Sequence, residues 1–265
     1  MCLILLSHGV HPEYPLVVAA NRDEFLDRPA QPAAPWETNP AILAGRDLKE
    51  GGTWLGITAE KALCAITNFR EPSNIMRDAP TRGVLVRDFL LSKTTALSWL
   101  EDLQSHDRQY NGFNLLTYRS RTFAYHSNRS GTAPRLVPPG FHGLSNHLLD
   151  TPWPKVEKGL DGFRILHENG TIQSGDLLDL LADSSRAPDE LLPSTGVPRE
   201  VERALSSMFI RMPGYGTRCS TAILFHANGD IEFRERTFDF NGSTVADRRY
   251  LIPEGMAIRD ARPEE

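Results

Sequence analysis

Apolar, strand-like runs in this sequence come in adjacent pairs, and this pairing limits the fold more than any other feature. The runs of each pair are rich in branched residues and are separated by short polar segments, which predicts β-hairpins. Three pairs follow this pattern: residues 2–8 with 14–22, 52–58 with 62–69, and the two halves of 220–238. Asn228 and Gly229, at the centre of the third pair, are a strong hairpin-turn signal. The chain is therefore predicted to form antiparallel sheets.

Helical spacing is found between these pairs. Apolar residues recur three and four positions apart in residues 83–92, 96–104, 153–168, 174–183 and 197–209. Further strands are predicted at 113–120 and 122–128, with a short one ending at residue 146. Helices grouped between strand pairs, without regular β-α-β alternation, argue against a doubly wound parallel sheet. The predicted fold class is α+β, with antiparallel sheets covered by helical layers.

Residues 28–52 interrupt this pattern with many prolines and glycines. Such a composition predicts a long surface loop, and loops of that length are usually functional. The chain of 265 residues is within the range of one domain, and we expect a single domain over residues 1–265.

The composition excludes several classes of partner. The formal net charge is -5, so no overall positive field would hold nucleic acid. No run approaches the roughly 20 apolar residues of a membrane-spanning helix. Three cysteines without a CxxC pair fit a reducing cytoplasm. The eight histidines are scattered, and we expect no protein-built metal site.

The position of Cys2, directly behind the initiator methionine, suggests a nucleophile that brings its own base. Methionine aminopeptidases remove Met1 when the second residue is small, and cysteine qualifies. The exposed α-amino group has a pKa of about 7.7 to 8.0, near the thiol value of about 8.5, so it can take the thiol proton. The other interpretation is a small apolar residue that begins a strand.

The polar cluster Asn21, Arg22, Asp23 and Glu24 ends the second run of the first predicted hairpin. A hairpin would return this cluster to the neighbourhood of Cys2. An arginine beside a thiol lowers its pKa, and a carboxylate can orient an ammonium group. The alternative interpretation of the cluster is a strand-end salt bridge with a turn.

Seven short sequence motifs follow one another along the chain. They are NRDE at 21–24, GGTWLG at 51–56, TNFR at 67–70, RGVLVRDFL at 82–90, YNGFNLL at 110–116, GLSNHLLDTPWPKV at 143–156 and GTRCST at 216–221. Together they resemble the NRDE family, which is the family of the transport and Golgi organisation protein 2. The resemblance runs from residue 2 to about residue 240.

Members of that family look like N-terminal nucleophile hydrolases of the αββα type, similar to the choloylglycine hydrolase and penicillin V acylase group. The resemblance therefore implies a four-layer αββα sandwich and hydrolysis of a linear amide bond. Carried over position by position, the implied catalytic residues are Cys2, Arg22, Asp23, Asn68, Asn146 and Arg218. Predicted substrate-binding residues are Asn21, Glu24, Trp54 and Arg70.

The implied roles follow the chemistry of acyl transfer. Cys2 attacks the carbonyl, while Asn68 and Asn146 donate hydrogen bonds to the oxyanion. Arg218 either holds a substrate carboxylate or pairs with Asp23. In the acylases the Arg and Asp are separated by two residues, whereas Arg22 and Asp23 are adjacent here. Adjacent strand residues point to opposite faces, so either the strand is distorted or only one of Arg22, Asp23 and Glu24 faces the thiol.

A second function class remains open on the same resemblance. Eukaryotic relatives are linked to haem trafficking and to lipid or acyl-CoA metabolism, which would make the chain a binding protein on a hydrolase scaffold. The expected partner in either case is a small molecule: an amide, a lipid or a haem-like ligand. No resident cofactor is expected, and haem would be a ligand of the carrier.

Overall fold

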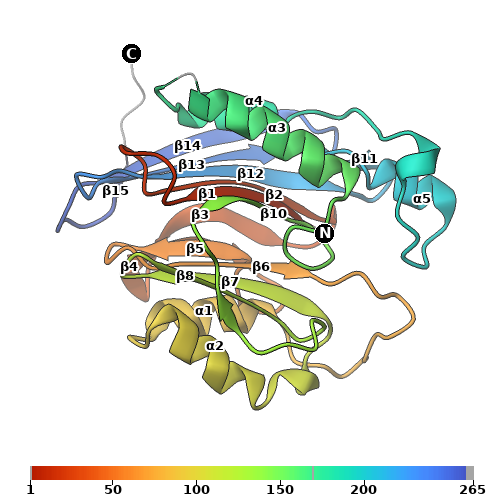
Figure 1. The fold of residues 1–265 in the computed structure, drawn as a ribbon, viewed down its shortest axis with the longest axis horizontal. Coiled ribbons are helices and arrows are strands. Elements are labelled where there is room, and N and C mark those ends of the chain that lie inside the picture. The colour runs from red at the N-terminus through yellow and green to blue at the C-terminus, as the bar shows by residue number, and fades with distance from the viewer. Residues whose placement is uncertain (1, 169, 261–265) are drawn as a thin grey trace.

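Two antiparallel β-sheets lie face to face, and helices cover the outer face of each (Figure 1). This computed structural model describes residues 2–168 and 170–260. The order of the layers is helix, sheet, sheet, helix. The predicted four-layer αββα sandwich is therefore confirmed.

The first sheet contains the N-terminal hairpin. In spatial order it is built from β10 (Gly140–Leu144), β1 (Cys2–His8), β2 (Leu16–Phe25), β12 (Tyr215–Phe225), β13 (Ile231–Phe238), β14 (Thr244–Ile252) and β15 (Arg259–Asp260), with β11 (Arg211–Met212) paired to β12. Its outer face is covered by α3 (Pro154–Glu168) and α4 (Ser174–Leu180). A short helix, α5 (Arg199–Ala204), lies beyond one end of the sheet, after the 3-10 turn η2 (Asp189–Leu191).

The second sheet follows the order of the chain. It is built from β3 (Ala30–Trp36), β4 (Asn39–Asp47), β5 (Leu55–Thr58), β6 (Leu63–Asn68), β7 (Phe113–Arg119), β8 (Thr122–Ser127) and β9 (Arg135–Leu136). Its outer face is covered by α1 (Gly83–Leu91) and α2 (Ala96–Gln104), which precede the 3-10 turn η1 (Asp107–Gln109). The whole second sheet is therefore inserted in the chain between β2 and β10 of the first sheet.

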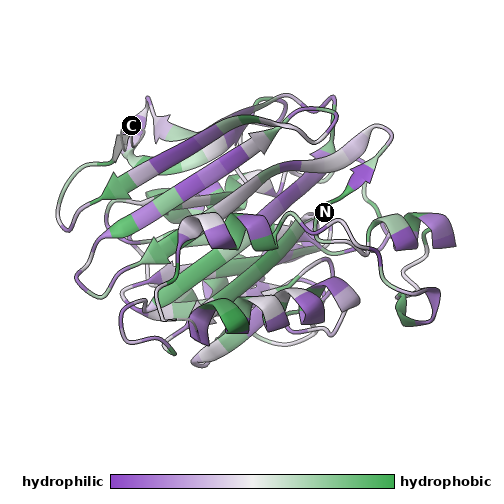
Figure 2. Cartoon of the chain, turned by 90° about the horizontal axis from the view of Figure 1, so that it is seen from above, coloured by the Kyte–Doolittle hydropathy of each residue, from purple (hydrophilic) through white to green (hydrophobic). Residues whose placement is uncertain are grey.

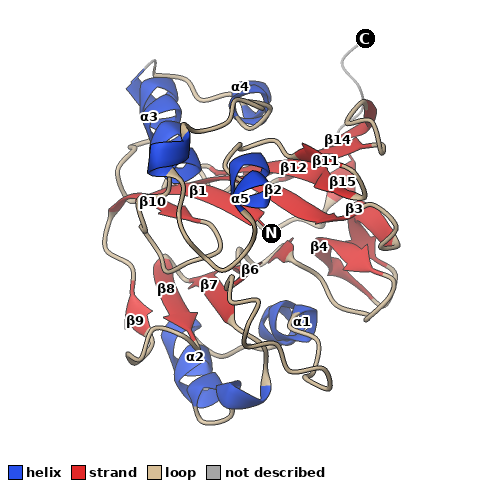
Figure 3. Ribbon diagram, turned by 90° about the vertical axis from the view of Figure 1, so that its right-hand side faces the viewer, coloured by secondary structure: helices blue, strands red, loops and turns tan. Residues whose placement is uncertain are grey.

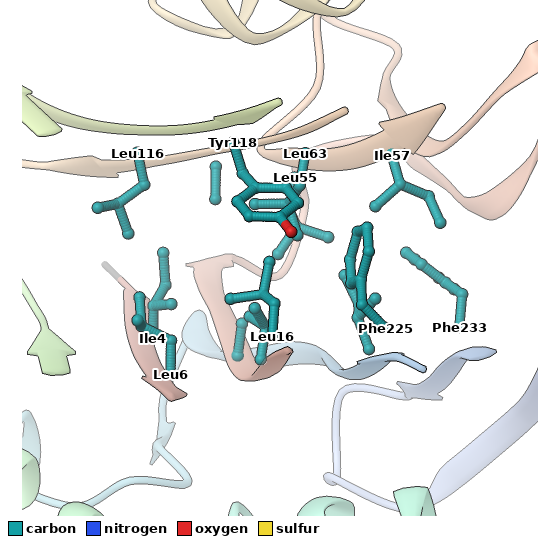
Figure 4. Packing of buried hydrophobic residues seen from close by; sticks show 14 of the residues in the cluster. Ile4, Leu6, Leu16, Leu55, Ile57, Leu63, Leu116, Tyr118, Phe225 and Phe233 are labelled. Carbon is teal, nitrogen blue, oxygen red and sulfur yellow. The ribbon is translucent and has the colours of Figure 1, made fainter. Parts of the chain in front are cut away.

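Alternation along the strands divides the core into layers. On β1, Ile4 faces the second sheet, whereas Leu3 and Leu5 face the helices α3 and α4. Figure 4 shows Ile4 and its neighbours pointing across the space between the sheets toward Leu116 and Tyr118. In Figure 2 the inner strands are mostly hydrophobic, whereas the helices also present hydrophilic residues. Burial of these apolar faces on both sides of each sheet holds the four layers together.

The prediction of a surface loop over residues 28–52 is wrong, because most of this segment forms the hairpin β3–β4. β3 contains Pro32 and Pro35, which have no N–H group to donate. Its pairing with β4 shifts register between Gln31 and Ala34 and again after Pro35. β3 is the edge strand of its sheet, where prolines and irregular pairing are tolerated.

The helix predicted for residues 197–209 is also shorter than expected, since α5 ends at Ala204. The hydroxyl groups of Ser206 and Ser207 donate to carbonyls three residues earlier, at 2.7 and 3.3 Å. Such bonds compete with the continuing helix. Met208 and Phe209 are nevertheless buried, so their apolar spacing marks the core rather than the length of the helix.

β1 is an interior strand of the first sheet, and it begins on the side of the sandwich that faces the viewer in Figure 3. The loop from β6 to α1, residues 69–82, leaves the second sheet on the same side of the molecule (Figure 1). None of the helices in the described ranges combines the length and the apolar character that a bilayer-spanning helix requires.

Candidate active site

Cys2 lies directly across from Arg22 in the β1–β2 pair, and Arg22 in turn lies across from Cys219 of β12. Directly opposed residues of antiparallel strands share one face of the sheet. The side chains of Cys2 and Arg22 therefore lie next to each other, in the space between the two sheets. The hairpin thus brings Arg22 of the polar cluster to the N-terminal thiol.

The guanidinium group of Arg22 is held by an aromatic ring. Its central carbon lies 4.1 Å from the ring centroid of Trp54, which precedes β5 in the second sheet. The Arg22 residue is only 6% exposed, yet it forms no hydrogen bond or ion pair with another residue that the structure describes. Stacking therefore fixes the orientation of this cation and leaves its N–H groups available to a ligand.

An open cleft of about 220 Å³ lies at this edge of the sandwich, and half-buried Cys2 lines it. Its walls come from the end of β2, from residues 50–54, from the end of β6 and from residues 79–83. The loop that supplies residues 79–83 is tied down by Asn111, whose side-chain amide exchanges two hydrogen bonds with the backbone of Met76, at 2.8 and 2.9 Å. The cleft is thus assembled from both sheets and from one restrained loop.

Asn21 lies on the opposite face of β2 from Arg22, as strand alternation requires. Its side-chain amide donates to the carbonyls of Leu181 and Met208, at 3.0 and 2.9 Å, and Asn21 is 1% exposed. The structure therefore does not bring Asn21 to the cleft. It ties the first sheet to the segments that follow α4 and α5.

Asp23 also points away from the space between the sheets. Its Oδ1 atom accepts a hydrogen bond from the Thr217 hydroxyl at 2.7 Å, and its backbone carbonyl accepts one from the Tyr215 hydroxyl at 3.0 Å. The pairing of β1 with β2 is regular, and the register shift lies in β12 between Thr217 and Cys219. Arg22 and Asp23 therefore occupy opposite faces of an undistorted strand, and Glu24 returns to the cleft.

The ionisation of the Cys2 thiol reflects opposing effects. Burial raises the pKa of the Cys2 thiol, and the Asp23 carboxylate raises it further. The charge of the N-terminal ammonium group, a hydrogen bond from the Asp23 backbone N–H and the charge of Arg22 lower this pKa, but the net direction is upward. The thiol is therefore protonated at neutral pH in this state, and a nucleophilic reaction requires a base close to the sulfur.

Two further arginines stand at the cleft. Arg28 donates two hydrogen bonds to Asp47, at 3.0 and 2.5 Å, and Glu24 lies 4.0 Å from its Nε atom. Arg82 donates one hydrogen bond, to the Gly112 carbonyl at 2.9 Å, and has no other among the described residues. Burial lowers the pKa of the Arg82 guanidinium, while Glu24 and Cys2 raise it. Arg82 is therefore close to the thiol, and its remaining N–H groups are available to a ligand.

The two predicted oxyanion donors lie in different places. Asn68 ends β6 and lines the cleft. Asn146 is fully buried, and its side-chain amide donates to the backbone carbonyl of Asn68 at 2.8 Å. The Asn146 carbonyl in turn accepts the Arg70 N–H, also at 2.8 Å. Asn146 therefore contacts the end of β6 and does not reach the cleft lining.

Arg70 lies outside the cleft lining as well. Its guanidinium forms an ion pair with Glu202 at 2.5 Å and packs over Trp153, with 4.8 Å from its central carbon to the ring centroid. Both partners of the ion pair are nearly inaccessible, at 6% and 2% side-chain exposure. Arg70 thus connects the end of the second sheet to α5 and to the segment before α3.

Arg218 is the extra residue of the bulge in β12. Its Nη1 atom donates to the backbone carbonyls of Phe25, Leu26 and Arg28, at 2.9, 3.0 and 3.1 Å. These bonds secure the turn after β2, which carries Arg28 to the cleft. In this structure the bonds of Arg218 go to that turn rather than to Asp23.

Three residues near the thiol were not among the predicted site residues: Arg28, Arg82 and Lys155. Lys155 is 2% exposed, and its charge interacts with those of Asp23 and Cys2. Arg82 and Lys155 both stand inside the sequence motifs that suggested the family, so the motifs contained a signal for them. A lysine in the first turn of a helix, where the helix dipole disfavours a cation, is a second signal for Lys155.

No group of three or more His, Cys, Asp or Glu side chains in the described ranges is arranged to hold a metal ion.

Comparison with known proteins gives one family match. The model of the family described as Transport and Golgi organisation 2 matches residues 1–240. The chain is 39% identical over 259 residues to the Transport and Golgi organization protein 2 homolog of Bos taurus, and 38% identical over 258 residues to that of Homo sapiens. Each match covers 89% of this chain and 93% of the relative. The Drosophila melanogaster protein of that name is 28% identical over 266 residues, covering 89% and 92%.

Two solved structures are similar at low sequence identity. The Caenorhabditis elegans N-acylethanolamine-hydrolyzing acid amidase ortholog gives a TM-score of 0.47 at 10% identity, covering 84% of this chain and 92% of that one. The C2A mutant of the conjugated bile acid hydrolase from Clostridium perfringens gives 0.44 at 10% identity, covering 100% and 97%.

Proposed function

This chain belongs to the Transport and Golgi organisation 2 family, and we propose that it is a cysteine N-terminal nucleophile hydrolase that cleaves a linear amide bond. The observation that supports the proposal most directly is the place of Cys2: it begins β1, lines the cleft and lies beside the guanidinium of Arg22, which has no ion-pair partner among the described residues. Removal of Met1 puts an α-amino group on the same residue as the thiol. Met1 itself lies outside the described residues.

The proposed reaction uses that amino group as the base. The α-amine takes the thiol proton, and the thiolate sulfur attacks the carbonyl carbon of the substrate. When the C–N bond breaks, the α-ammonium returns the proton to the leaving amine, and a thioester remains on Cys2. Water then attacks the thioester with the same amine as base, which releases the carboxylic acid and restores the thiol. The raised thiol pKa makes this internal base necessary.

Charge that develops on the carbonyl oxygen needs donors in the cleft. We assign this role to Asn68, which lines the cleft, and we assign to Asn146 the role of holding Asn68 through the hydrogen bond at 2.8 Å. Loss of one such donor typically costs about 10² to 10³ in rate. Arg22 and Arg82 have free N–H groups close to the sulfur and would bind the polar end of the substrate.

The proposal also includes a reducing compartment, the cytoplasm. Cys2, Cys64 and Cys219 are all free thiols in the structure, and the last two are buried. A free thiol nucleophile needs such surroundings to stay reduced.

The proposal is tested by separating the thiol from its amine. A variant with one extra glycine ahead of Cys2 keeps the thiol but moves the free amine to the added residue. With a panel of linear amides, we expect the processed wild-type protein to turn over at least one substrate. The glycine variant should lose about 10² to 10⁴ in kcat, the usual contribution of a positioned base, and Cys2→Ala should be inactive.

The glycine variant must still fold, which circular dichroism and its reaction with iodoacetamide would establish. Equal turnover by the glycine variant and the wild type would contradict the proposed base. Titration with haemin, followed by its absorption band, tests the carrier: tight stoichiometric binding that Cys2→Ala leaves unchanged, without turnover of any amide, would contradict the hydrolase.

A further inference from the structure

Lys155 is a buried lysine that local helix chemistry does not explain. It stands in the first turn of α3, is 2% exposed, and its Nζ atom has no hydrogen-bond partner among the described residues. Lysines are almost never fully buried unless they are paired, and the positive end of a helix dipole disfavours a cation. A negative charge on another element must therefore stabilise the buried ammonium group of Lys155.

The charged groups that face Lys155 come from several elements around the N-terminus of β1. They are Asp23 on β2, Cys2 on β1, Arg70 after β6 and Glu202 on α5. Glu202 is already bound to Arg70 at 2.5 Å and accepts two hydrogen bonds from Thr195. Asp23 is therefore the carboxylate whose charge Lys155 chiefly compensates.

The electrostatics of the two groups agree with this assignment. Burial raises the pKa of the Asp23 carboxyl, and Lys155 is the strongest of the groups that lower it. Burial likewise lowers the pKa of Lys155 to about 8, with Asp23 as the strongest opposing charge. The other groups that face Asp23 are the N-terminal ammonium group, the Thr217 and Tyr215 hydroxyls, Cys2, Arg22 and Arg70. Of the two arginines, Arg22 lies on the other face of β2, and Arg70 is already bound to Glu202.

We propose that Lys155 is a positioning residue for the nucleophile: its buried ammonium group keeps the Asp23 carboxylate ionised, so that the carboxylate can hold the α-amino group of the processed Cys2. Lys155 is not part of the cleft lining, so its effect is exerted through Asp23. In the reaction the α-amine gains the thiol proton and later returns it to the leaving amine, while Lys155 keeps its own protons throughout. This inference rests on the proposed function, because it requires the α-amine as the base.

The first test follows the ionisation of Asp23 and needs no substrate. In protein labelled with ¹³C at the aspartate carboxyl groups, the Asp23 signal is assigned from its loss in Asp23→Asn. Replacement Lys155→Met should raise the titration midpoint of that signal by about one pH unit or more, the usual effect of a neighbouring opposite charge. The matched control Lys158→Met removes an exposed lysine of the same helix, which is paired with Asp183, and should leave the midpoint unchanged. An unchanged midpoint in Lys155→Met overturns the inference.

The second test uses the pH profile of amide hydrolysis. In Lys155→Met the acid limb of kcat/KM should move to higher pH by the same amount, which is about a tenfold loss per unit below the midpoint, and activity should approach the wild-type value above that limb. A loss of equal size at every pH indicates a merely structural role and overturns the inference.

A double variant allows the inference to be tested even if Lys155→Met misfolds. If Lys155→Met alone does not fold, Asp23→Asn with Lys155→Met removes both buried charges, and its profile is compared with that of Asp23→Asn. We expect the two profiles to coincide, whereas a further loss in the double variant overturns the inference. Absence of amide hydrolysis by the wild type would instead contradict the proposed function, and the titration of Asp23 would still decide the role of Lys155.

Discussion

The reactivity of Cys2 depends on its thiol pKa, which neighbouring groups shift in opposite directions. Burial and the Asp23 carboxylate raise the thiol pKa, while the N-terminal ammonium group, the Asp23 backbone N–H and Arg22 lower it. Arg22 is stacked on Trp54 at 4.1 Å and has no ion-pair partner among the described residues. The effects of Asp23 and Arg22 on the thiol pKa both come from the neighbouring strand β2.

Replacement Arg22→Met should therefore make Cys2 less reactive at neutral pH. We expect the midpoint of Cys2 alkylation by iodoacetamide to rise by about one pH unit, because a nearby opposite charge lowers a pKa by this order. The matched control is Arg46→Met, which removes an arginine stacked on Trp36 at 5.1 Å and contributes no lining to the cleft. A midpoint that stays constant or falls in Arg22→Met would show that Arg22 does not stabilise the thiolate.

At the scale of elements, the site forms where β1 begins and where β2 and β6 end. Asn146 connects this point to the segment before α3, since its amide donates to the Asn68 carbonyl at 2.8 Å. Its own carbonyl accepts the N–H of Arg70. The position of Asn68 is thus controlled by a residue that lies outside the cleft.

Asn146→Ala should lower kcat with little change in KM, because it displaces the Asn68 donor without removing a group that binds substrate. The half-buried carbonyl of Asn68 loses its side-chain partner, so we also expect about 1 kcal/mol less stability. Val17→Ala serves as a control and should leave kcat unchanged. It shortens a fully buried side chain on the face of β2 that packs against α3 and α4. Unaltered kcat in a folded Asn146→Ala protein would rule out this positioning role.

The strand pairing could be predicted where it was local. The pairs 2–8 with 14–22 and 220–238 have alternating or continuous apolar runs around short turns, and both form hairpins. The hairpin β3–β4 could not be predicted, because Pro32 and Pro35 are typical of loops and only an edge position makes them compatible with a strand. The end of α5 at Ala204 could not be predicted either, because the apolar spacing continues to Phe209. Only the folded chain shows the hydrogen bond from the Ser206 hydroxyl that competes with the helix.

In the whole molecule, the site forms only where the two sheets of the sandwich meet. Arg22 from the first sheet stacks on Trp54 beside the second, so neither sheet alone forms the cleft. The proximity of Cys2 to the end of β2 could be predicted from the hairpin. The proximity of Lys155 to Asp23 could not, because more than one hundred residues and the entire second sheet separate them in the chain.

In the proposed mechanism, one residue supplies both the thiol and the base. The decisive measurement is the intact mass of protein isolated from its own host, before and after exposure to an electrophilic amide or lactone. We expect loss of Met1 and a single adduct, located on Cys2 by peptide mapping and absent in Cys2→Ala. Quantitative retention of Met1, or a Met1-free protein that forms no Cys2 adduct, would contradict it.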